Sequence, residues 1–103
     1  MNDLTRTHCE HLLYVLRAPP QLLQDILICP SFLLVTTVCE LALNLLYGDL
    51  QLTDEDKDVL RRHKELLEQL ADSGVEFRPK VILVRYVETE LLGKFREILE
   101  RYV

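Results

Sequence analysis

The chain has 103 residues, of which 49% are hydrophobic and 28% charged, and its formal net charge at pH 7 is -5. This length is typical of one domain, so we expect a single domain over residues 1–103 with one hydrophobic core. The surplus of acidic residues disfavours wholesale binding to nucleic acid or anionic lipid, since both are held mainly by basic side chains.

Apolar residues at helical spacing predict three helices in the first half of the chain. Prolines separate them, because proline interrupts a helix interior but fits the first turn of a following helix. We expect these helices at about residues 5–17, 21–29 and 32–47. The third is apolar nearly all round, which predicts that other elements cover it on most sides.

A thin polar stripe runs along this third helix. It consists of Thr37, Glu40 and Asn44, which are spaced i, i+3 and i+7. Two interpretations are open: the stripe is the exposed edge of the helix, or it is a buried polar contact that fixes the register of a partner. We therefore include the three residues among the candidate partner-binding residues.

Strong end signals mark a fourth helix. Gly48 is expected to end the third helix as a left-handed cap, and residues 49–52 form the link. Thr53 is a good N-cap, and the three acidic residues after it suit the positive end of the helix dipole. We predict one helix from Thr53 to Gly74, held in place by packing of its leucine stripe more than by exposed ion pairs.

The last segment has two possible structures. The β-branched run 81–84 could be a short strand paired with residues 75–77. We favour one helix with Pro79 in its first turn, because apolar residues recur at intervals of three or four from Val84 to Tyr102. Gly93 weakens this helix by about 1 kcal/mol relative to alanine and is expected to mark a close helix contact. The fold class is therefore all-α, a compact bundle of about five helices.

The cysteines and the hydropathy bear on location. Cys9, Cys29 and Cys39 do not form a disulfide framework, and the first residues lack a signal-peptide pattern. We expect a reducing, intracellular setting, cytoplasmic or nuclear. The apolar run 32–47 is interrupted by Glu40 and Asn44 and falls short of a membrane span, so none is expected.

Candidate chemistry in the first helix is limited. His8, Cys9 and His11 bring two imidazoles and a thiol together, but the other cysteines stand alone, whereas zinc motifs pair their ligands at two places. Surface histidines and buried structural thiols are the favoured interpretation, and no metal or cofactor is expected. Cys-His catalysis would need a third partner that the sequence does not supply, so we expect no enzyme activity.

Arg61, Arg62 and Lys64 form, with His63, the one basic cluster, and they are further candidate partner-binding residues. A phosphate contact and a solvated face are both open. Neighbouring acids and the lack of an interleaved aromatic residue favour the solvated face. The spacing predicts i,i+4 ion pairs from Asp58 to Arg62, Arg61 to Glu65 and Lys64 to Glu68.

Residues 12–85 resemble a family of small helical proteins encoded by Maverick/Polinton transposons and adintovirus-like elements. The motifs that carry the resemblance are Cys39-Glu40, Ala42-Leu43-Asn44, Gly48, Leu52, Leu60-Arg61-Arg62-His63-Lys64, Leu66-Leu67 and Leu70-Ala71-Asp72. The resemblance implies a helical virion-core or DNA-associated accessory protein of a virus or mobile element. This chain carries acids where that family is basic and lacks its Gly-Gly-Phe-Leu tail, which weakens the nucleic-acid implication.

Two functional hypotheses follow. The first is a non-enzymatic protein-protein interaction or assembly module that forms a homodimer or binds a helical partner, because the helices carry more apolar surface than a small chain buries alone. The alternative is a nucleic-acid-associated virion-core accessory protein that binds phosphate through a local basic face. That face would consist of Arg61, Arg62, Lys64, Arg78 and Lys80.

Overall fold

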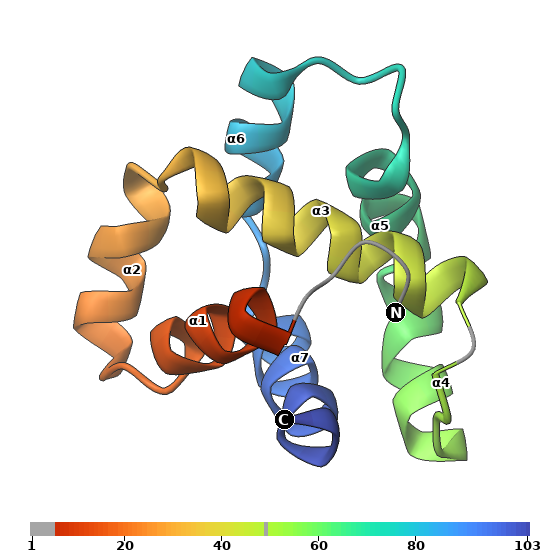
Figure 1. The fold of residues 1–103 in the computed structure, drawn as a ribbon. Coiled ribbons are helices and arrows are strands. Elements are labelled where there is room, and N and C mark those ends of the chain that lie inside the picture. The colour runs from red at the N-terminus through yellow and green to blue at the C-terminus, as the bar shows by residue number, and fades with distance from the viewer. Residues whose placement is uncertain (1–5, 49) are drawn as a thin grey trace.

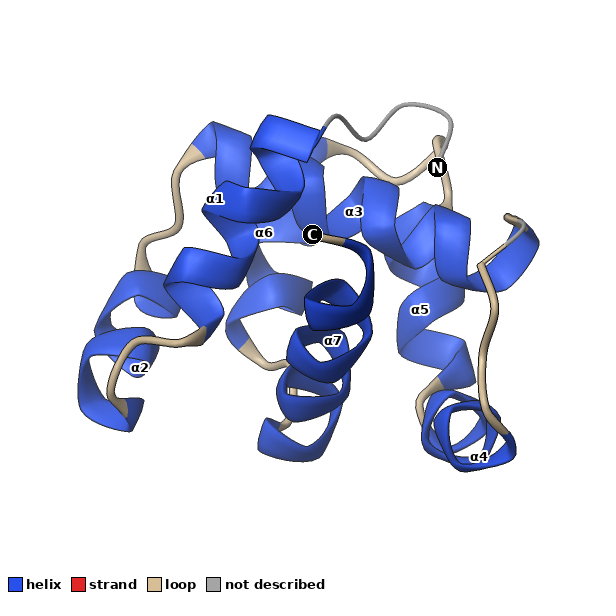
Figure 2. Ribbon diagram, turned by 60° about the horizontal axis from the view of Figure 1, so that its bottom comes forward, coloured by secondary structure: helices blue, strands red, loops and turns tan. Residues whose placement is uncertain are grey.

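A computed structural model describes residues 6–48 and 50–103, and over these residues the chain forms helices and no strand (Figures 1 and 2). The helices are α1 Arg6–Leu16, α2 Pro20–Ile28, α3 Phe32–Tyr47, α4 Asp54–Arg62, α5 Lys64–Ala71, α6 Phe77–Arg85 and α7 Thr89–Tyr102. The predicted all-α class is confirmed, and the prediction of about five helices was an undercount. The expected helix start at Thr5 and the link residue Asp49 lie outside the described residues.

Helix α3 is the centre of the molecule. It packs most extensively against α5 and also against α1 and α6, while α7 packs against α1 and α4 (Figure 1). Leu41 of α3, Leu67 of α5 and Phe95 of α7 are fully buried in one continuous core. The described residues form one globule with a Cα radius of gyration of 12.4 Å.

The predicted fourth helix is two helices, because the chain breaks at His63. His63 has φ -114° and ψ 20°, and its N–H donates to the Leu60 carbonyl at 3.1 Å, which closes α4 with a tight turn. The break allows α4 to pack against α7 while α5 packs against α3. No proline or glycine marks it, so tertiary packing overrides a local sequence that would continue the helix.

The predicted last helix is likewise two helices. Residues 81–84 lie in α6, so the helix prediction is confirmed and the strand alternative is wrong. Val87 N–H donates to the Val84 carbonyl at 3.2 Å, and extended Glu88 then begins α7. Helix α6 packs against α2, α3 and α5, whereas α7 packs elsewhere, so the bend serves two different packing surfaces.

The end signals were partly right. Thr53 caps α4 as predicted: its hydroxyl accepts from Asp56 N–H at 3.0 Å, and the Asp56 carboxylate accepts from Thr53 N–H at 2.9 Å. Gly48 follows α3 but has φ -88°, so the predicted left-handed cap is wrong. Glycine is needed there for close approach, because a Cβ would lie 2.6 Å from the Asn44 carbonyl oxygen.

The two other glycines also differ from expectation. The fifth helix ends at Ala71, and Gly74 lies beyond it in a turn where its N–H donates to Asp72 Oδ1 at 2.8 Å. The predicted close contact at Gly93 is wrong, because a Cβ there would meet no atom within 4 Å. Gly93 therefore borders open space on the surface of α7.

A buried ion network joins α4 to α7. Asp56, 1% exposed, accepts from Lys94 Nζ at 3.0 Å and from Arg101 Nη2 at 2.7 Å. Lys94, 6% exposed, also donates to Glu97 at 2.6 Å. Burial alone would raise the pKa of Asp56, but the hydrogen bonds from Thr53, Lys94 and Arg101 outweigh it and hold that pKa well below its ordinary value.

Membrane-spanning length and hydropathy are not found in any single helix of the described chain. Helices α2 and α3 reach them only as a pair, and a bend of 100° separates the two.

Candidate interaction groove

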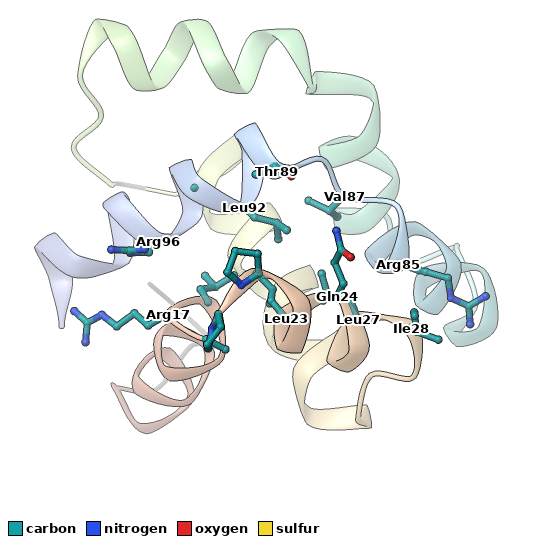
Figure 3. A pocket seen from close by; sticks show the side chains of 15 residues that line it. Arg17, Leu23, Gln24, Leu27, Ile28, Arg85, Val87, Thr89, Leu92 and Arg96 are labelled. Atoms are coloured by element: carbon teal, nitrogen blue, oxygen red, sulfur yellow. The ribbon is translucent and has the colours of Figure 1, made fainter.

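An open groove with a volume of about 660 Å³ lies between α2 and α7 (Figure 3). We call it the α2–α7 groove. Leu23 and Leu27 of α2 face Leu92 of α7 across it, and Val87 of the α6–α7 link closes one side. Its volume is in the range of sites that bind ligands, roughly 300–1,000 Å³.

The prolines explain why α2 stands apart from α7. Ala18 N–H donates to the Val15 carbonyl at 3.0 Å and ends α1, after which extended Pro19 and first-turn Pro20 redirect the chain. Helix α2 then packs against α6, whereas α7 packs against α1 and α4. Leu27 is the one buried residue of α2, whereas Leu23 is half-buried and Gln24 and Ile28, which also line the groove, are exposed.

Arginines stand at both ends of the groove. Arg17 and Arg96 lie at one end and Arg85 at the other (Figure 3). Glu100 Oε1 is 2.9 Å from Arg96 Nε and 3.5 Å from Arg17 Nε. The hydrogen bond from Arg96 is the main cause that lowers the pKa of Glu100, and Arg17 adds to it.

The groove suits binding better than catalysis. Apart from the arginines, its polar lining comes only from Gln24 and Thr89 among the residues that the structure describes. Carboxylate, imidazole and thiol groups are missing from that lining, and these are the usual general acids, bases and nucleophiles. An apolar floor with cationic ends can instead receive an apolar ligand that carries negative charge.

Two of the three residues of the predicted polar stripe are buried. Thr37 is 2% exposed and donates to the Leu33 carbonyl at 2.7 Å, and Asn44 is 5% exposed and donates to the Glu40 carbonyl at 2.7 Å. Both side chains thus bond to their own helix. Glu40 is half-buried, and its Oε2 atom is buried with no hydrogen-bond partner among the described residues. The role of this stripe in partner binding stays a prediction.

The predicted basic cluster is exposed and its three charged residues are paired with acids. Arg61 Nη1 lies 3.0 Å from Asp58, Arg62 Nη2 lies 3.1 Å from Glu90, and Lys64 Nζ lies 3.7 Å from Glu68. Of the predicted i,i+4 pairs, Lys64 with Glu68 is confirmed. The other two are wrong, because the break at His63 turns Arg62 toward α7 and Arg61 pairs with Asp58 one turn back.

Glu90 connects this cluster to α7. Besides Arg62 it contacts His63, whose Nε2 lies 3.0 Å from Glu90 Oε1. Hydrogen bonds from Arg62 and then from His63 lower the pKa of Glu90. Arg78 and Lys80, the other members of the predicted basic face, are on the first turn of α6. Figure 1 shows this turn beyond the C-terminal end of α5, whereas the α4–α5 junction is at the N-terminal end of α5.

The predicted scarcity of cysteine and histidine chemistry concerns the burial and grouping of these residues. Cys9 and Cys39 are buried, burial chiefly raises the pKa of each thiol, and Cys29 is exposed. Within residues 6–48 and 50–103, no group of three or more His, Cys, Asp or Glu side chains is placed to hold a metal ion.

Neither the groove nor the buried network is predicted by a local sequence pattern. Arg17, Arg85 and Arg96 are far apart in sequence and form no motif, so nothing local indicated a shared site. One available signal was Lys94, which lies between Leu91 and Ile98 on the apolar stripe of α7. A charge at that position must find a partner if it is buried.

Comparisons with known proteins identified no relative. A scan against protein-family models found no match, and searches of curated proteins and of solved structures found none either. The relation to Maverick/Polinton and adintovirus-like elements therefore stays a prediction from motif residues.

Proposed function

We propose that this chain is a non-enzymatic protein-interaction module that binds a segment of a partner protein in the α2–α7 groove. The observation that carries the proposal is the open, apolar groove of about 660 Å³ between two helices that pack on other elements rather than on each other. Binding there would bury apolar surface that the free chain exposes to water. Removal of apolar surface from water is favourable by about 25 cal/mol per Å².

Exposed side chains near the groove support this proposal. Ile28, at the end of α2, lines the groove and is 57% exposed. Phe32 follows Ile28 by four residues, and its ring centroid lies 5.1 Å from that of Phe77 of α6, with both side chains exposed. Single exposed apolar residues are common, but several beside an apolar groove are typical of an interaction surface.

The nucleic-acid alternative has weaker support. Arg61, Arg62 and Lys64 already contact carboxylates, so a phosphate would have to displace an internal partner at each residue. The net charge of -5 adds long-range repulsion from a polyanion. An origin in a virus or mobile element, which the resemblance implies, stays a prediction beside this proposal.

A displayed library of helical peptides, selected on the wild-type chain, tests the proposal. Gly93→Leu adds a side chain at the edge of the groove where a Cβ meets no atom within 4 Å, so the variant should fold. Gln24→Trp narrows the groove from exposed Gln24 on α2. We expect both variants to bind the selected peptides at least tenfold more weakly, because they occupy the space that a peptide side chain needs.

Lys57→Leu changes an exposed residue of α4 outside the groove, so it is the matched control and should bind like wild type. Circular dichroism verifies the fold of every variant. Selected peptides that bind all variants equally would show that the α2–α7 groove is not the binding site. A library from which nothing binds the wild-type chain would also count against the proposal.

A further inference from the structure

We infer that the segment bound by the α2–α7 groove is an amphipathic helix with acidic residues at both ends of its apolar face. This inference rests on the proposed function and names the chemical class of the partner. It is carried by the apolar floor together with Arg17 and Arg96 at one end of the groove and Arg85 at the other (Figure 3).

Backbone hydrogen bonding favours a helical occupant. The groove is walled by helices, and the described part of the chain has no strand whose edge could pair with an extended peptide. A peptide that enters an apolar groove must satisfy its own N–H and C=O groups, and a helix does so internally. Leu23 and Leu92 then offer a surface for apolar side chains spaced i, i+3 or i+4, and i+7.

Charge complementarity favours acids on that helix. The described groove lining contains three arginines and no acidic residue, although the chain as a whole carries a net charge of -5. Arg85 is exposed and has no ion-pair partner among the described residues. A fatty acid also combines an apolar chain with a carboxylate, but only at one end, whereas the groove has cations at both.

Glu100 lies outside the groove lining but contacts two of its arginines in the free chain. One carboxylate oxygen, Oε1, contacts both Arg17 and Arg96. An acidic side chain of the partner would meet the same two guanidinium groups, so Glu100 acts as an internal stand-in that competes with it. Removal of the Glu100 charge should therefore strengthen binding of an acidic helix.

The first experiment varies the ends of a helical peptide. The probe is a displayed two-turn leucine face in an alanine-rich scaffold, with Glu, Gln and Lys sampled at the flanking positions. Selection on the wild-type chain should enrich Glu at both flanks. A synthetic Glu-flanked peptide should bind about tenfold more tightly than its Lys-flanked counterpart, since reversal creates like-charge contacts with arginine.

The second experiment reverses the charge of the groove. Arg85→Glu should weaken binding of the Glu-flanked peptide about tenfold and strengthen binding of a peptide with Lys at the flank that meets residue 85. Lys57→Glu makes the same change of net charge on α4, away from the groove, and should leave both affinities near wild type. Equal effects of the two variants would indicate a general charge effect and overturn the inference.

The third experiment removes the internal competitor. Glu100→Gln should bind the Glu-flanked peptide about threefold more tightly, the size expected for release of exposed ion pairs. Glu65→Gln removes a charge from an exposed position of α5 and should leave binding unchanged. Unchanged or weaker binding by the Glu100 variant would overturn the role given to Glu100.

Failure of this inference differs from failure of the proposed function. One outcome is that Gly93→Leu and Gln24→Trp weaken peptide binding but the peptides show no preference for Glu at their flanks. The groove would then still be a binding site, and its specificity for acidic helices would be overturned. Selected peptides that bind both groove variants as tightly as they bind the wild-type chain would overturn the proposed function as well. Saturation of the groove by decanoate at the affinity of the best peptide would overturn the assignment to a helix.

Discussion

A single carboxylate organises the contact between α4 and α7. Asp56 completes the capping box of α4 and accepts from both Lys94 and Arg101 of α7. Lys94 is almost fully buried, so its charge depends on Asp56 and on the more exposed Glu97. Breaking a buried pair is costly because it leaves an unpaired charge in an apolar setting.

Asp56→Asn should therefore lower the free energy of unfolding by about 3 kcal/mol. The amide keeps the size of the side chain but loses the charge that pairs with Lys94 and Arg101. Urea denaturation measures the change. Asp54→Asn, at the exposed start of the same helix, is the control and should cost about 0.5 kcal/mol. Equal losses in the two variants would mean that the buried network adds nothing.

The same carboxylate makes stability depend on pH. The pKa of Asp56 in the folded chain lies well below its ordinary value of 3.8. Its stabilising effect is therefore complete above about pH 5, and it is lost progressively as the pH falls through the ordinary pKa toward the lower pKa of the folded chain. Urea denaturation from pH 7 to pH 2 should show the wild type losing its advantage over Asp56→Asn across the acid range. An advantage that stays constant would contradict the assignment.

At the scale of residues, the sequence predicts the structural role of a side chain better than it predicts which residue that side chain contacts. Thr53 was identified as an N-cap because capping is local, with its partner three residues away. The pair of Asp56 with Lys94 joins positions 38 residues apart, and no periodicity specifies it. The stripe of Thr37, Glu40 and Asn44 was recognised as polar, but the burial of Thr37 and Asn44 is set by what packs around α3.

At the scale of elements, two glycines should respond oppositely to alanine. Gly48→Ala places a Cβ 2.6 Å from the Asn44 carbonyl oxygen, a backbone atom that can move only with α3, so we expect a loss of about 1–3 kcal/mol. Gly93→Ala adds a Cβ in open space and removes flexibility from α7, so we expect a gain of about 1 kcal/mol. Thermal unfolding of both variants measures whether each is less or more stable than the wild type. A destabilised Gly93→Ala would mean that α7 needs glycine for another reason.

Helix positions were predictable where proline, glycine or a cap marks the boundary. The prolines before α2 and α3 and the cap at Thr53 mark real boundaries. The breaks at His63 and after Arg85 were missed because the residues around them suit a helix interior. At both points the chain bends so that successive helices pack on different neighbours, which is a property of the tertiary fold.

At the scale of the molecule, the α2–α7 groove could not be predicted from sequence. It exists because α2 packs against α6, whereas α7 packs against α1 and α4. The pattern of each helix predicts an apolar face but not which neighbour covers it. Excess apolar surface was predicted in total, and its location depends on helix directions that the proline turn and the α6–α7 link set.

The charge of the whole molecule gives the last prediction. Light scattering during size-exclusion chromatography at low salt should give the same mass for the chain with and without a short DNA duplex. The net charge is -5, and Arg61, Arg62 and Lys64 are held by carboxylates, so few phosphates can be neutralised. A shift onto the duplex that disappears as salt rises would instead support the nucleic-acid alternative.

The same measurement separates two occupants of the α2–α7 groove. If a second copy of this chain fills the groove, the wild type should be a dimer, and Gly93→Leu should convert it to a monomer. If the occupant is an acidic helix of another protein, Gly93→Leu should leave the mass of the chain unchanged and weaken only peptide binding. Because the leucine side chain would fill the groove, a dimer that survives Gly93→Leu must form through another surface of the chain. The α2–α7 groove would then still be free to bind a partner protein.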